Sequence, residues 1–180
     1  VFPPLHQPGS VLGKVRGFSE LDGISVVAVG SHDTASAVAG IPLSEDGCSA
    51  YISSGTWSLV GLELKTANTT AETFKSNITN ELGVENRIRF IKNVAGLWML
   101  EESIRYWRKD GLNLTAKELV EQAGKLKSSG VIVNARDPKY TKSGAIPEWI
   151  AQEFKDKGVA APTTPSEFAL VIFESLADAY

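Results

Sequence analysis

The chain has 180 residues, of which 43% are hydrophobic and 22% charged, with a formal net charge of −3. This composition is typical of a soluble globular protein, and the small negative charge argues against nucleic acid or an anionic membrane as the partner. No apolar run approaches the ~20 residues needed to cross a bilayer. With Cys48 as the single cysteine, no intramolecular disulfide can form, and we expect a cytoplasmic location.

The two ends of the sequence indicate a piece of a longer protein. The chain starts at Val1 rather than at a methionine, and its first residues lack the basic and apolar regions of a signal peptide. Its last segment, PSEFALVIFESLADAY, repeats apolar residues at helical spacing and carries no stop signal before Tyr180. We therefore expect an internal fragment.

The first predicted unit covers residues 1–45. Residues 1–24 are expected to be irregular, because prolines and glycines punctuate them. The run ISVVAVG, Ile24 to Gly30, is continuously apolar and is typical of a strand buried on both faces. A short helix, DTASAVAGI, follows it. Pro42 and the polar SEDG then end the unit, so we place a domain boundary between residues 45 and 46.

The second predicted unit covers residues 46–180. It opens with two β-type runs, SAYISSG and TWSLVGLEL, and continues with a hairpin whose arms flank Gly83. The clearest helix is GLWMLEESIRYWRKDG, with Gly111 just beyond its end. Capping boxes predict two more helices, at Thr115 with Glu118 and at Thr164 with Glu167. Strands and helices in this order indicate an α/β fold of packed layers.

Three polar residues, His32, Asp33 and Thr34, come directly after the predicted buried strand. In open α/β sheets, ligands bind at the carboxyl ends of strands. An aspartate there can take the proton of a bound hydroxyl group while that oxygen attacks an electrophile. The alternative is structural, since aspartate also caps helices well. The motif alone leaves both interpretations open.

A second candidate is the turn Ser53-Ser54-Gly55-Thr56 between the two β-type runs. Backbone N–H groups and a threonine hydroxyl in such a turn can hold a phosphate. The alternative is a plain hairpin turn, which serine and glycine favour. The sequence contains no GxxxxGK[ST] loop, and its two histidines supply a zinc site poorly. The four tryptophans are expected to be core or helix-packing residues.

Four blocks, SHDTASAVAGIP, AYISSGTWSLVGLE, ITNELG and IKNVAGLWMLEE, occur in order. Together they resemble the FGGY family of carbohydrate kinases, most closely members that act on L-rhamnulose. The resemblance implies an α/β fold of two actin-like, ribonuclease-H-like domains around a cleft. Residues 1–45 would then be the C-terminal end of the first domain, and residues 46–180 the N-terminal part of the second.

The resemblance implies roles for four residues on the sugar side. Asp33 matches the general base of the family's HDT motif. His32 and Thr34 match positions that hold the ketose, and Asn93 matches a further sugar contact.

On the nucleotide side, the resemblance implies ATP with Mg²⁺. Thr56 matches a threonine that contacts the phosphates, and Glu101 stands where close relatives carry a glutamine that contacts the nucleotide. A carboxylate beside a triphosphate is unfavourable unless a cation intervenes.

The implied activity is phosphorylation of L-rhamnulose to L-rhamnulose 1-phosphate by the full-length enzyme. Because the family's N-terminal phosphate loop and its later glycine-rich segment have no counterpart here, we expect the isolated fragment to be inactive. Its exposed apolar surface would favour self-association. A kinase for fuculose or xylulose and a non-catalytic sugar-binding module are the alternatives.

Overall fold

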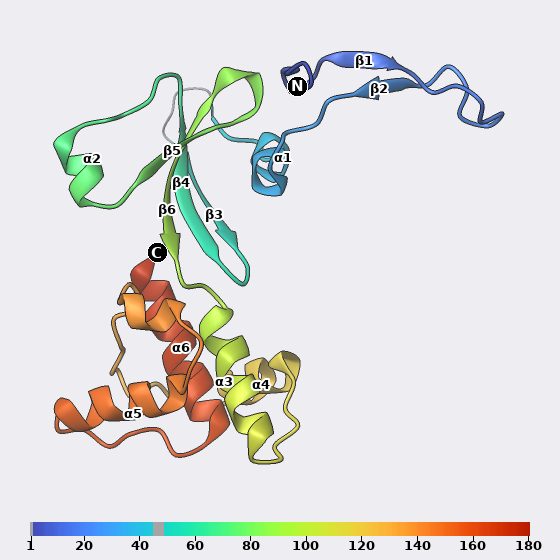
Figure 1. Cartoon of the computed structure of the whole chain (residues 1–180). Coiled ribbons are helices and arrows are strands. Elements are labelled where there is room, and N and C mark those ends of the chain that lie inside the picture. Colours follow the sequence, from blue (N-terminus) through green and yellow to red (C-terminus); the bar gives the residue numbers. More distant parts are fainter. Residues whose placement is uncertain (1, 45–48) are drawn as a thin grey trace. The chain divides into compact units, whose positions relative to one another are not determined.

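The computed structural model describes residues 2–44 and 49–180, and its helices and strands are labelled in Figure 1. The chain forms two compact units. One comprises Val1–Tyr51 and Gly61–Lys92, and the other comprises Ile52–Val60 and Asn93–Tyr180. The predicted boundary between residues 45 and 46 and the single cysteine, Cys48, lie outside the described residues.

The main sheet has four strands in the order β3-β4-β6-β5. Their bounds are Ala50–Ser54 for β3, Ser58–Leu64 for β4, Thr79–Leu82 for β5 and Ile88–Val94 for β6. Strands β5 and β6 are antiparallel, with Leu82 opposite Ile88, which confirms the predicted hairpin. A single 3₁₀ turn, η1 (Val84–Asn86), joins them, and Glu85 and Asn86 adopt φ values of +56° and +58°.

An ion pair between a buried arginine and a partly exposed glutamate links the arms of this hairpin. Arg89 on β6 is only 1% exposed, and its Nη2 donates to Glu81 Oε2 across the strands at 2.8 Å. In the same unit, burial raises the pKa of Tyr51 to about 12, and Arg89 partly opposes that shift. Since a buried guanidinium is costly without a counter-charge, Glu81 holds this part of the sheet together.

The N-terminal segment forms a two-stranded antiparallel ribbon of β1 (Val11–Lys14) and β2 (Ser25–Val27). The prediction of a strand buried on both faces is therefore wrong. Val26 and Val27 are 42% and 46% exposed, and Val29 is 77% exposed. Within the described residues the ribbon gains no third strand, and two strands alone cannot bury both of their faces. The expectation of irregular structure before residue 24 also misses β1.

Two short helices complete this unit, α1 (Asp33–Ala39) and α2 (Ala71–Lys75). The first confirms the predicted helix after the apolar run, and it buries Ala35 and Val38 while packing against η1. Gly30 lies close to α1 just before the helix begins, since an added Cβ atom would lie 2.8 Å from Ser36 Oγ and 3.1 Å from the Ser36 backbone nitrogen. The backbone therefore passes close to the side of α1 before the helix begins.

The second unit is largely helical, and four of its helices pack together (Figure 1). They are α3 (Trp98–Lys109), α4 (Ala116–Ala123), α5 (Ile146–Asp156) and α6 (Pro165–Ala179), with a 3₁₀ turn η2 (Pro138–Thr141) before α5. Both predicted capping boxes form, at the starts of α4 and α6. Gly111 follows α3 with φ at +84°, as the helix-end pattern predicts.

The core of this unit lies between α3, α4, α5 and α6. The predicted apolar stripe of α3 points into it, with Leu100, Ile104 and Trp107 all buried. From α6, Ile172 is fully buried. No helix among the described residues is long and apolar enough to span a membrane. Packing in this core holds α3 in place, and the first turn of α3 carries Glu101, one of the two candidate nucleotide residues.

Candidate functional site

The triplet His32, Asp33 and Thr34 lies at the start of α1. His32 is the N-cap residue, with extended backbone angles and no side-chain capping bond, and Asp33 is the first helical residue. Asp33 is therefore not the N-cap residue, although its carboxylate accepts a backbone N–H of the first helical turn. This contact uses only one of its two carboxylate oxygens.

The two oxygens of the Asp33 carboxylate differ in their surroundings. Oδ1 accepts hydrogen bonds from the Thr34 backbone N–H at 2.7 Å and from Thr34 Oγ1 at 3.4 Å. The Nδ1 atom of His32 lies 3.3 Å from the same oxygen. Oδ2 forms no hydrogen bond within the described part of the chain, and the side chain is 95% exposed. One oxygen is oriented by its neighbours while the other can meet a ligand.

The Ser53–Thr56 turn, in the other unit, is fastened to the start of α3. The carbonyl oxygens of Gly55 and Thr56 accept from the backbone N–H groups of Leu97 and Trp98, at 2.9 and 2.8 Å. The first N–H groups of a helix need such partners. The turn therefore packs its carbonyl side against the helix N-terminus.

Gly96 makes this contact possible. It has φ at +56°, and an added Cβ would lie 2.7 Å from the carbonyl oxygens of both Gly55 and Thr56. No real Cβ atom approaches oxygen so closely, so only glycine fits between the strand end and the turn. Sequence reasoning missed this residue, because a glycine in VAGLW shows no sign of which distant backbone it meets.

Thr56 and Glu101 come together although 45 residues separate them. The Thr56 hydroxyl donates to Glu101 Oε1 at 3.1 Å, and both side chains are exposed. Glu101 stands in the first turn of α3, directly beyond the residues that bind the turn. The structure thus brings together the two residues that the resemblance placed on the nucleotide side.

Three further contacts border the same turn. Trp57 stacks on Trp98, with ring centroids 6.2 Å apart and planes 11° apart, and Arg105 lies over the Trp98 ring. Ser58, fully buried, shares a 2.6 Å hydrogen bond with the Tyr180 hydroxyl at the end of α6. Trp57 is 47% exposed, so of the two roles expected for the tryptophans it has that of packing on a helix, through Trp98, rather than that of a core residue.

Asn93 is exposed near the end of β6, three residues before Gly96. It belongs to the same unit as Thr56 and Glu101, whereas His32, Asp33 and Thr34 belong to the other unit. The predicted site residues therefore form two local groups, one at the start of α1 and one around the start of α3.

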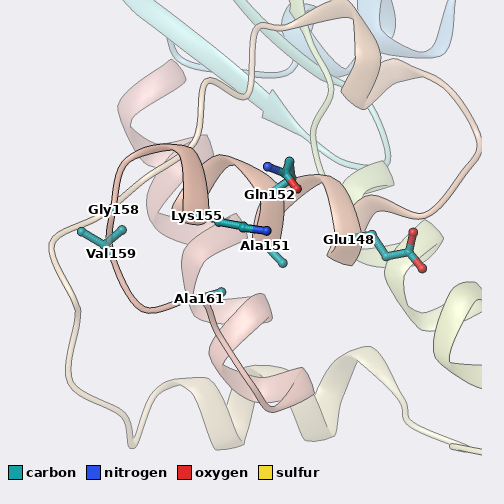
Figure 2. Close-up of a pocket in the computed structure, with 7 residues that line it drawn as sticks. All are labelled: Glu148, Ala151, Gln152, Lys155, Gly158, Val159 and Ala161. Atoms are coloured by element: carbon teal, nitrogen blue, oxygen red, sulfur yellow. The ribbon is translucent and has the colours of Figure 1, made fainter.

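A hollow of about 610 Å³ runs along α5 (Figure 2). Its walls include Ala151 and Ala161, and the side chains of Glu148 and Lys155 project from α5. None of the predicted site residues lines it. Among the residues that the structure describes, no group of three or more histidine, cysteine, aspartate or glutamate side chains could hold a metal ion.

The sequence profile of the C-terminal domain of the FGGY family of carbohydrate kinases matches residues 50–180. The chain belongs to this family. The prediction of the FGGY fold is thereby confirmed, namely an α/β fold of the actin-like, ribonuclease-H-like type.

Three curated FGGY relatives illustrate the similarity. Rhamnulokinase of Enterococcus faecalis is 34% identical over 184 residues, covering 100% of this chain and 36% of the relative. Rhamnulokinase of Bacillus subtilis is 37% identical, covering 99% and 37%. Rhamnulokinase of Pectobacterium carotovorum is 40% identical, covering 97% and 34%. The chain thus spans about a third of the length of the curated relatives it matches.

Proposed function

We propose that the full-length protein carrying this chain transfers the γ-phosphoryl group of ATP to L-rhamnulose, giving L-rhamnulose 1-phosphate. The observation that carries the proposal is the Asp33 carboxylate, which is oriented through Oδ1 and open at Oδ2. A module that only binds sugar needs no such base. Similarity along the whole chain to proteins named rhamnulokinase supports the choice of ketose.

On the sugar side, Asp33 Oδ2 accepts the proton of the 1-hydroxyl group. The sugar oxygen forms a bond to the γ-phosphorus as the bond between that phosphorus and the ADP oxygen breaks. His32 and Thr34 hold both the carboxylate and the sugar hydroxyls, and Asn93 supplies an amide for a further hydroxyl. Because phosphoryl transfer depends mainly on positioning, a base fixed through one oxygen suits this task.

On the nucleotide side, the turn at Thr56 lies beside the phosphates, and Glu101 lies next to it. The contact of the turn with α3 fixes where Thr56 stands before any ligand arrives. Preorganised groups of this kind need no rearrangement at the moment of reaction.

The donor set at this turn fits Mg²⁺, which prefers oxygen ligands and keeps several of its waters. Thr56 Oγ1 and the Glu101 carboxylate are hard oxygen donors, and both are exposed. When bound, the metal ion supplies charge neutralisation for the phosphates. These two residues would hold it, directly or through its waters.

ADP release by the full-length protein tests the proposal, with Mg-ATP and a panel of L-rhamnulose, L-fuculose, D-xylulose and glycerol. We expect a strong preference for L-rhamnulose. Preference for another ketose would contradict the substrate while keeping a sugar kinase. Sugar binding by a folded protein without any ADP release would contradict the kinase function itself.

A further inference from the structure

We propose that Glu101 makes the nucleotide site selective for nucleotide that carries a divalent cation. In this view Thr56 and Glu101 face the cation rather than a bare phosphate oxygen. The inference rests on the proposed function and specifies which form of the nucleotide the site accepts.

The first argument is the direction of the hydrogen bond between the two side chains. A threonine hydroxyl has one proton to donate, and here that proton goes to Glu101 Oε1 at 3.1 Å. An ionised carboxylate only accepts. The pair therefore offers lone pairs and no donor. Phosphate oxygens need donors, whereas a divalent cation binds to lone pairs.

The second argument is the uncompensated charge of Glu101. Within the described part of the chain Glu101 forms no ion pair. Arg105, one turn further along α3, has Nη1 2.7 Å from Glu102 Oε1 and packs over Trp98. Glu102 is 3% exposed, so it retains the arginine. A polyphosphate without a cation would meet a net negative charge here.

The third argument is that the backbone carrying Thr56 is held beside the first turn of α3. Two backbone hydrogen bonds from the start of α3 hold the carbonyl groups of Gly55 and Thr56. Rotation of the Thr56 hydroxyl toward a phosphate would break its hydrogen bond to Glu101, but the negative charge would stay on the first turn of α3. A cation bound between the carboxylate and the phosphate turns this repulsion into attraction.

The test measures ADP binding to the full-length protein by calorimetry, once with excess Mg²⁺ and once with EDTA. We expect the wild type to bind Mg-ADP more tightly than metal-free ADP. Glu101→Gln keeps an acceptor for Thr56, removes the charge and adds an amide donor. We expect this variant to bind metal-free ADP about tenfold more tightly than the wild type. Removing the repulsion between two exposed negative charges in contact changes a dissociation constant by about tenfold.

A control and a second variant make the result specific. Glu121→Gln changes the same charge at an exposed position on α4, and it should leave the ratio of the two affinities unchanged. Glu101→Lys should raise the affinity for metal-free ADP more than Glu101→Gln does, so that metal-free ADP binds more tightly than Mg-ADP. Both Glu101 variants replace an exposed side chain, and circular dichroism verifies that each is folded.

The inference is overturned if Glu101→Gln and Glu101→Lys bind both forms of ADP with the wild-type ratio. That result would leave the proposed function intact, because nucleotide would still bind. A folded wild type that binds ADP neither with Mg²⁺ nor with EDTA would instead overturn the nucleotide side of the proposed function, and this inference with it.

Discussion

Replacing Gly96 with alanine tests how the Thr56 turn is held. The new methyl group would lie 2.7 Å from the carbonyl oxygens of Gly55 and Thr56 and 2.8 Å from the Ser58 backbone nitrogen. All three are backbone atoms, so none can swing aside as a flexible side chain could. A φ of +56° adds about 1–2 kcal/mol of backbone strain for any L-residue. Overpacking adds about 1–3 kcal/mol. We therefore expect a loss of about 2–5 kcal/mol in stability.

Gly111→Ala is the matched control for this change. Gly111 also has a positive φ, +84°, but an added Cβ would meet no atom within 4 Å. The control therefore carries the strain of about 1–2 kcal/mol without the clash.

The assay for both variants is urea unfolding of the full-length protein together with ADP affinity. Gly96→Ala should lower the unfolding midpoint more than the control and weaken ADP binding, because the turn must shift. Gly111→Ala should leave ADP affinity unchanged. Equal midpoints and equal ADP affinities for the two variants would refute the argument that Gly96 fixes the turn.

Three further predictions follow from other contacts. Asp33→Asn should lower kcat by about 10²–10⁴-fold while calorimetry shows sugar binding largely kept, and near-normal turnover would exclude Asp33 as the base. Glu81→Gln should destabilise the protein in urea by about 1–3 kcal/mol, less than for a fully buried pair because Glu81 is 39% exposed; a loss no larger than that of Glu121→Gln would contradict the role of the ion pair. Backbone N–H groups of Thr163 and Thr164 lower the pKa of Glu167 from 4.5 to about 2. Its contribution to stability should therefore be complete above pH 4.5 and disappear as the pH falls toward 2. The stability difference between wild type and Glu167→Gln, measured by thermal unfolding, should shrink over this range, and a difference that stays constant would contradict it.

Local signals in the sequence predicted much of the helical unit. The capping boxes at Thr115 and Thr164 and the glycine after α3 lie where the pattern places them. Each depends on residues within one or two helical turns, which sequence spacing reveals directly. The hairpin around Gly83 is likewise set by residues that lie close together in the sequence.

Features set by distant contacts could not be predicted in this way. The run Ile24–Gly30 reads as buried from its composition, yet burial depends on what covers a strand, and here β2 pairs only with β1 among the described residues. The hydrogen bond between Thr56 and Glu101 spans 45 positions, and the close approach of Gly96 to the turn is visible only in three dimensions. The resemblance named Thr56 and Glu101, but not the bond between them.

The most direct test of the central claim is kcat/KM of the full-length protein with Mg-ATP and L-rhamnulose. It should be measured beside the same protein with Asp33→Asn, and phosphorus NMR should identify the product. The account predicts rapid turnover by the wild type, phosphate on the 1-oxygen of the sugar, and loss of turnover in the variant. A folded wild type that releases no ADP with L-rhamnulose or any other ketose would contradict it.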